Sequence, residues 1–232
     1  MQISACPRPA LDPTLLRALW GIIGILILSN ILLIPSGTEL ASVDGSWGYL
    51  LRQIDLNSEG TLATWCSSML LFLNSLCAYI LARAFWAKDR RVARLLALIS
   101  FGFLALSIDD FIEFHEFVEG LEAGLLGSGG WQVSKATLGP LFAASLAVIL
   151  TALFAASSIR VACREGTPLV IASIACVCAG ALAEGVYILS GCDAPWCLRI
   201  EVVCEEGCEL LALVFFLSFQ SRWMRTLRDK NV

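Results

Sequence analysis

The segment "SIDDFIEFHEF", residues 107–117, places five ionisable side chains at the end of an apolar stretch. These side chains belong to Asp109, Asp110, Glu113, His115 and Glu116. The histidine is the only one in the chain. Carboxylates bind hard cations such as Ca²⁺, Mg²⁺ and Mn²⁺, and carboxylates with one imidazole also suit iron or zinc. The segment therefore predicts a site for a divalent metal cation, whose identity stays open.

A second acidic group lies near the C-terminal end, in "EVVCEEGCE", residues 201–209. Glu201, Glu205 and Glu209 follow the spacing i, i+4, i+8, which places them on one face of a helix. A lone glutamate also interrupts the apolar stretch that precedes this segment. Four glutamates complete the predicted set of metal ligands: Glu184, Glu205, Glu206 and Glu209.

The composition is that of a membrane protein. Of the 232 residues, 58% are hydrophobic and only 16% are charged, and the mean hydropathy is +0.78. Soluble domains are about 45–50% apolar. We therefore expect the lipid bilayer and a metal ion or proton as partners, and no nucleic acid.

Uncharged stretches locate the membrane spans. Four of them are close to the roughly 20 residues that cross a hydrocarbon core: 18–34, 61–82, 136–159 and 166–183. Two shorter ones, 95–108 and 210–221, reach that length only if neighbouring acids enter the membrane; otherwise they are half-spanning or interfacial. We predict six spans, near 15–35, 62–84, 92–114, 137–160, 168–190 and 199–221. The expected fold class is all-α, a polytopic transmembrane helix bundle that forms one domain over residues 1–232.

The basic residues orient this bundle. With six spans, 13 of the 16 Lys and Arg residues fall on the side that holds the N-terminus. The positive-inside rule makes that side cytoplasmic, so both termini are expected inside. All the acids of the predicted site then lie in the outer half of the membrane. An ionisable group within a span costs about 2.5–3.5 kcal/mol, so such a cluster needs a bound cation, protons or access to water.

Small residues follow the acids along each helix. The helix face that carries Asp109 also carries Ala105 and Gly102, and Glu184 lies one turn after Gly180. Small residues at such positions allow helices to pack closely. This favours acids that face other helices. Simpler interpretations stay open: a solvated helix end at 109–119, a hydrated helix N-terminus at 201–209 where the dipole favours acids, and a lone hydrogen-bonded acid at Glu184.

Two further stretches carry structural expectations. Cys192 and Cys197 lie in the predicted outer loop between the last two spans, where an oxidising compartment permits a disulfide. The remaining cysteines are mostly in or beside spans, and buried cysteine behaves as a small hydrophobic residue. "GSWGYLLRQIDL", residues 45–56, predicts an interfacial amphipathic turn with Trp47 and Tyr49 at headgroup level.

The helix with Ile108-Asp109-Asp110 and His115-Glu116 resembles one in uncharacterised bacterial multi-pass membrane proteins. These carry Leu-Asp-Glu followed by His-Glu, and a later acidic pair that Glu205-Glu206 matches here. Asp110 replaces the glutamate of that pattern. The resemblance implies the bacterial inner (plasma) membrane and brings no known activity.

We expect an outward-facing carboxylate–histidine cluster that binds a metal cation. Its use stays open between a metal-dependent enzyme acting on a lipid-soluble substrate and a cation or proton transporter. A structural subunit of a membrane complex, or a homo-oligomer, is a further alternative. The sequence has no Glu-x-x-His pair, P-loop, GxSxG or dinucleotide-binding pattern that would assign an enzyme class.

Overall fold

The computed structural model describes residues 11–33, 45–56, 60–112, 166–191 and 194–229. Within these ranges the chain is entirely helical, which confirms the all-α prediction. The helices are α1 (Pro13–Leu33), α3 (Gly45–Ile54), α4 (Leu62–Phe85), α5 (Arg90–Ile112), α8 (Thr167–Ser190) and α9 (Pro195–Asp229).

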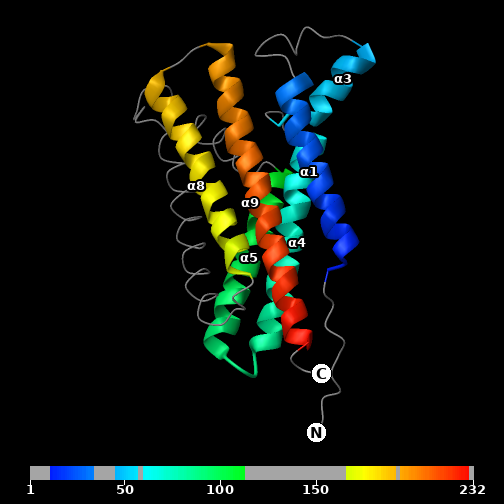
Figure 1. The fold of residues 1–232 in the computed structure, drawn as a ribbon, viewed down its shortest axis with the longest axis vertical. Helices are drawn as coiled ribbons and strands as arrows, with labels where there is room; N and C mark the ends of the chain where they lie inside the picture. Colours follow the sequence, from blue (N-terminus) through cyan, green and yellow to red (C-terminus); the bar gives the residue numbers. More distant parts are fainter. Residues whose placement is uncertain (1–10, 34–44, 57–59, 113–165, 192–193, 230–232) are drawn as a thin grey trace, which may run out of the picture.

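The long helices form a bundle of two antiparallel hairpins, α4 with α5 and α8 with α9, together with α1 (Figure 1). The central element is α9, which packs against α8, α4 and α1. The start of α1, the α4–α5 turn and the end of α9 lie at one end of the bundle, and the α8–α9 turn lies at the opposite end (Figure 1). This arrangement brings helices that are far apart in the sequence into contact.

Four of the long helices agree closely with predicted spans. Four are long and apolar enough to cross a membrane: Pro13–Leu33, Leu62–Phe85, Arg90–Asp110 and Thr167–Tyr187. The predicted span 199–221 lies inside α9, which has 35 residues and carries several acids in its first half, so it does not join these four. The predicted span 137–160 lies outside the described residues. The chain is thus a helical membrane protein, and the count of six remains a prediction.

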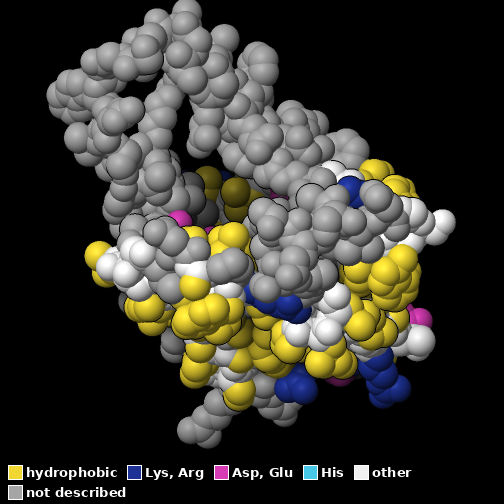
Figure 2. All heavy atoms as spheres, turned by 90° about the horizontal axis from the view of Figure 1, so that it is seen from above, with side chains coloured by type: hydrophobic (Ala, Val, Ile, Leu, Met, Phe, Trp, Pro, Cys, Tyr) yellow, Lys and Arg dark blue, Asp and Glu magenta, His cyan; other side chains and the backbone are white. Residues whose placement is uncertain are grey.

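The outer surface of the bundle is apolar. Large hydrophobic side chains of three different helices are more than two-thirds exposed: Ile25 (68%), Phe101 (69%) and Leu182 (68%). Figure 2 shows hydrophobic side chains spread over the described part of the face that it presents. A monomeric soluble protein rarely exposes apolar patches of this extent. The exposed surface therefore suits contact with lipid chains.

The core follows α9 along its length. Val214 and Leu217 are fully buried, and the ring of Trp223 lies 5.3 Å from that of Phe85 on α4. Phe216 stacks near Phe103 of α5, with ring centroids 5.4 Å apart. Aromatic pairs at this spacing contribute about 0.5–1.5 kcal/mol beyond the area that they bury. These contacts hold α4 and α5 on one side of α9.

Serine hydroxyls join the helices where they approach closely. Ser75 Oγ on α4 donates to the Ser100 carbonyl oxygen on α5 at 2.7 Å, and Ser107 Oγ on α5 donates to the Ser68 carbonyl oxygen at 2.9 Å. Ser173 Oγ on α8 donates to the Ala212 carbonyl oxygen on α9 at 2.9 Å. Small side chains at helix interfaces permit such short separations. Both hairpins are therefore fixed in register.

The segment 45–54 is a helix rather than the predicted turn. Trp47 and Tyr49 on α3 are both exposed, as a headgroup position would require, although no membrane boundary is defined here. Asn30 of α1 is buried and holds the end of α3. Its Nδ2 donates to the Ile54 carbonyl oxygen at 2.6 Å, and its Oδ1 accepts from the Leu56 N–H at 3.0 Å.

Candidate functional site

The acids at the end of α5 face α4 through Asp110. Ser68 Oγ on α4 donates to Asp110 Oδ2 at 2.7 Å, one turn beyond the bond from Ser107 to the Ser68 carbonyl oxygen. Asp110, which the predicted helix-facing stripe did not include, thus contacts α4 directly. Ala105, one turn before Asp109, is exposed, whereas the α4-facing positions are those of Ser100, Ser107 and Asp110.

The glutamates of α9 form the largest part of the acidic group. The carboxyl groups of Glu205 and Glu201 lie one turn apart on α9, close enough to interact electrostatically. Glu205 also interacts electrostatically with Glu206 and with Glu184 of α8. Glu201 belongs to the group although the predicted ligand set omitted it. Its i, i+4 spacing to Glu205 was the signal that could have included it.

Glu209 connects the α9 glutamates to the other two helices. Its carboxylate interacts electrostatically with Asp110 of α5 and with Glu184 of α8. We use the term carboxylate cluster for the acids that these interactions connect: Asp110, Glu184, Glu201, Glu205, Glu206 and Glu209. The predicted meeting of these acids with Glu113, His115 and Glu116 falls outside the described residues and stays a prediction. Glu184, Glu201, Glu205 and Glu206 are half-buried.

Gly180 positions the cluster by letting α8 approach α9. A Cβ atom at this position would lie 3.3 Å from the Glu205 carbonyl oxygen and 3.5 Å from the Cys208 Cβ. The absence of a side chain therefore sets the separation of the two helices. Glu184 follows one turn later on α8, which places its carboxylate beside the α9 glutamates. The packing role inferred for Gly180 from sequence matches this contact.

Arg199 is the basic residue of α9 nearest to the cluster, but its side chain bonds to the end of α1. Its Nη2 donates to the carbonyl oxygens of Asn30 and Ile31, the latter at 2.9 Å, at the end of α1. A cation at this position satisfies unpaired carbonyls and complements the helix dipole. In the described ranges, no Lys or Arg forms an ion pair with Glu184, Glu205 or Glu209.

The described residues contain no group of three or more His, Cys, Asp or Glu side chains placed to hold a metal ion. Three predicted ligands, Glu113, His115 and Glu116, lie outside these residues. Asp109 lies within α5, next to Asp110. The metal site therefore stays a prediction, and the described acids are arranged as a spread-out cluster rather than a compact ligand set.

Cys197 is disulfide-bonded. Cys192, its predicted partner, lies outside the described residues, so that pairing remains a prediction. Among the described residues, six cysteines are free and all lie in helices: Cys66, Cys77, Cys176, Cys178, Cys204 and Cys208. Cys77 is buried in the core, as expected for a small hydrophobic side chain.

Two amide side chains lie inside the bundle, and Gln220 was not singled out from the sequence. Gln220 of α9 and Asn74 of α4 are fully buried. Asn74 Nδ2 donates to the Leu213 carbonyl oxygen at 3.1 Å. Within the described structure, Asn74 Oδ1 and both amide atoms of Gln220 have no hydrogen-bond partner. A glutamine amid the apolar residues 210–221 was the available signal.

Comparisons with known proteins place the chain in a family. No curated protein and no solved structure matches it. Residues 20–223 match the family described as "Domain of unknown function (DUF8692)". The match begins inside α1 and ends near the end of α9, so it includes every helix of the bundle at least in part. The chain belongs to the DUF8692 family.

Proposed function

We propose that the carboxylate cluster is a cation-binding site at which protons and a divalent metal ion compete. The proximity of the Glu201 and Glu205 carboxyl groups, one turn apart on α9, carries the proposal. Two ionised carboxylates that lie close together repel each other, and this repulsion favours a bound proton or cation. A divalent metal ion that binds here would displace such a proton.

Charge supports the same conclusion. Several acids lie near one another on helices with apolar outer surfaces, and within the described part of the chain Glu184, Glu205 and Glu209 have no basic partner. Each charge inside a membrane span costs about 2.5–3.5 kcal/mol. A proton shared by two carboxyl groups removes one charge, and a divalent cation neutralises two. His115, Glu113 and Glu116 follow in sequence and remain the expected additional ligands.

The proposed orientation puts the cluster on the outer side of a bacterial inner membrane. The start of α1, the α4–α5 turn and the end of α9 lie at the end of the bundle opposite the α8–α9 turn (Figure 1). These segments carry Arg17, Lys88 and Arg225. By the positive-inside rule, this basic end is cytoplasmic. The cluster lies in the first half of α9, toward the other end, so cations would enter from outside.

One further observation favours cation transport as the function of this site. Asn74, near the middle of α4, places a fully buried polar group below the cluster. Transporters commonly have polar groups at this depth, where a purely structural bundle would be apolar. A membrane enzyme that uses the same metal is the alternative, and it would require a lipid-soluble substrate beside the cluster.

Thermal unfolding of the purified protein tests the proposal. We expect one divalent metal among Ca²⁺, Mg²⁺, Mn²⁺ and Zn²⁺ to raise the unfolding midpoint, with a larger effect at pH 8 than at pH 6 because protons compete. At a hundredfold excess over the dissociation constant, the stabilisation is about 2.7 kcal/mol. Glu205→Gln should reduce this effect. Asp229→Asn, an exposed acid at the far end of α9, is the matched control.

Two results would count against the proposal. A midpoint that no metal changes at either pH would exclude the competition. Equal loss of the metal effect in Glu205→Gln and Asp229→Asn would show binding outside the cluster.

A further inference from the structure

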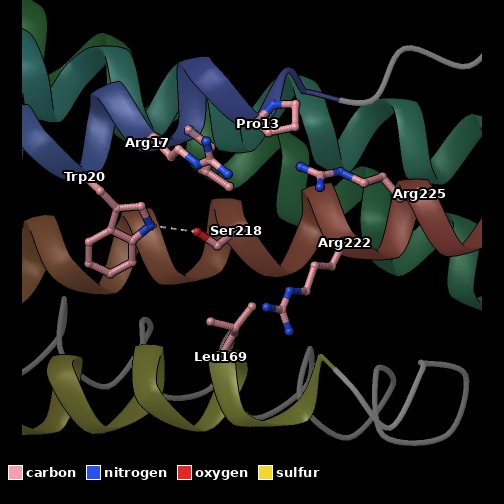
Figure 3. A pocket seen from close by; sticks show the side chains of 8 residues that line it. Pro13, Arg17, Trp20, Leu169, Ser218, Arg222 and Arg225 are labelled. Atoms are coloured by element: carbon pink, nitrogen blue, oxygen red, sulfur yellow. Dashed lines mark hydrogen bonds between the residues drawn. The ribbon is translucent and has the colours of Figure 1, made fainter.

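We propose that a basic pocket at the cytoplasmic end of α1, α8 and α9 binds the phosphate group of an anionic membrane phospholipid. The pocket has a volume of about 280 Å³. It lies near the start of α1 and the end of α9, away from the carboxylate cluster (Figures 1 and 3). The proposal depends on the bundle lying in a membrane and not on cation binding by the cluster.

Three arginines give the pocket its charge. Arg17 comes from α1, and Arg222 and Arg225 come from α9. Figure 3 shows the side chains of Arg17 and Arg225 extending into the space between the two helices, with Arg222 on the side of α8. The described residues that line the pocket include no acid. Three like charges around one opening favour an anion.

The chemistry of arginine identifies the anion as a phosphate. A guanidinium presents five N–H donors in a planar fork that matches phosphate oxygens. Arg225 Nη2 donates to Ser221 Oγ at 3.2 Å, which holds that side chain in place while its other donors stay available for further bonds. Two helices that each supply such a fork can grip one phosphate from opposite sides.

Apolar residues in the same pocket favour a lipid over a soluble phosphate. Trp20 and Leu169 line it, and Trp20 Nε1 donates to Ser218 Oγ at 3.2 Å. The Trp20 ring also packs edge-on against Phe215, with centroids 4.8 Å apart, so the indole is held at this level. Pro13 and Leu16 of α1 also line the pocket. A headgroup with attached acyl chains matches both the basic and the apolar parts.

The depth of the pocket agrees with that of lipid headgroups. The uncharged stretch of the first helix begins at residue 18, directly after Arg17. The uncharged stretch of α9 ends at residue 221, directly before Arg222. Both arginines thus lie where the apolar span meets the headgroup region. Basic pockets between transmembrane helices on the cytoplasmic side are known to bind anionic headgroups.

Lipid titration of the delipidated protein in detergent tests this inference, with EDTA present so that metal binding plays no part. We expect phosphatidylglycerol to raise the unfolding midpoint and to be retained in native mass spectra, whereas phosphatidylcholine does neither. Arg17→Gln and Arg225→Gln should each weaken the apparent affinity about fivefold, the effect of one basic residue at an anionic surface. Arg228→Gln, an exposed residue of the same helix that is paired with Asp229, is the matched control.

A second measurement does not depend on the folding of the arginine variants. Phosphatidylglycerol with brominated acyl chains should quench tryptophan fluorescence more than the brominated choline lipid does, and Trp20→Phe should remove this difference. Equal quenching by both lipids would overturn the proposal. Inorganic phosphate that binds as tightly as phosphatidylglycerol would also overturn it, because the ligand would then be a soluble anion.

Discussion

Replacing Gly180 by leucine tests how the α8–α9 contact builds the carboxylate cluster. A Cβ atom alone would lie 3.3 Å from the Glu205 carbonyl oxygen, and a full leucine side chain must push the helices apart. Overpacking of this kind costs about 1–3 kcal/mol. Replacing a glycine in a helix interior also raises helix propensity, which stabilises the fold by at most about 1 kcal/mol. We therefore expect Gly180→Leu to lower the free energy of unfolding by up to about 2 kcal/mol.

Gly185 provides the matched control on the same helix. No atom of a neighbouring residue lies within 4 Å of a Cβ atom built at this position. Gly185→Leu should therefore show the gain in helix propensity without the clash. Equilibrium unfolding in mixed detergent micelles, followed by circular dichroism, gives both free energies. Equal stabilities for Gly180→Leu and Gly185→Leu would refute the inferred close contact.

The structure makes three further predictions. Ser68→Ala removes the hydroxyl that bonds to Asp110 and should lower the free energy of unfolding by about 0.6–1.7 kcal/mol, the range for such bonds in membranes, while Ser29→Ala, whose hydroxyl bonds only within α1, should have little effect. Asn30→Ala should release the end of α3, seen as faster amide exchange over Gly45–Ile54 with α8 unchanged. Alkaline phosphatase fused after residue 130 should be active and after residue 88 inactive; the reverse would overturn the orientation.

Helix positions were largely predictable from the sequence because a membrane span needs about 20 uncharged residues in a row. The start and end of α4 and α8 agree with the predicted spans within one residue. The length of α9 was not predictable in this way. Hydropathy marks only the apolar part of a helix, and α9 continues to Asp229, beyond the predicted end of the span at 221.

The site was predictable in outline and not in detail. Spacing placed Glu201, Glu205 and Glu209 on one face, and it did not distinguish Asp109 from Asp110 as the acid that faces α4. Adjacent helical positions differ by about 100°, so the choice depends on which partner lies nearby. Here that partner is Ser68, on another helix.

The basic pocket was missed for the same reason. In the sequence, the arginines indicated only the orientation of the chain in the membrane. Their convergence depends on the packing of α1 against α9, between residues such as Trp20 and Ser218 that lie 198 positions apart. A pattern of neighbouring residues in the sequence does not predict a contact between such distant positions.

Calorimetric titration with the stabilising metal at pH 7, in two buffers of different ionisation enthalpy, tests the central claim most directly, because it counts the protons released for each metal ion bound. We expect saturable binding with release of at least one proton per metal ion in the wild type. Glu205→Gln should bind more weakly and release fewer protons, and Asp229→Asn should behave as the wild type. Metal binding without proton release, or no saturable binding of any divalent metal, would contradict the central claim.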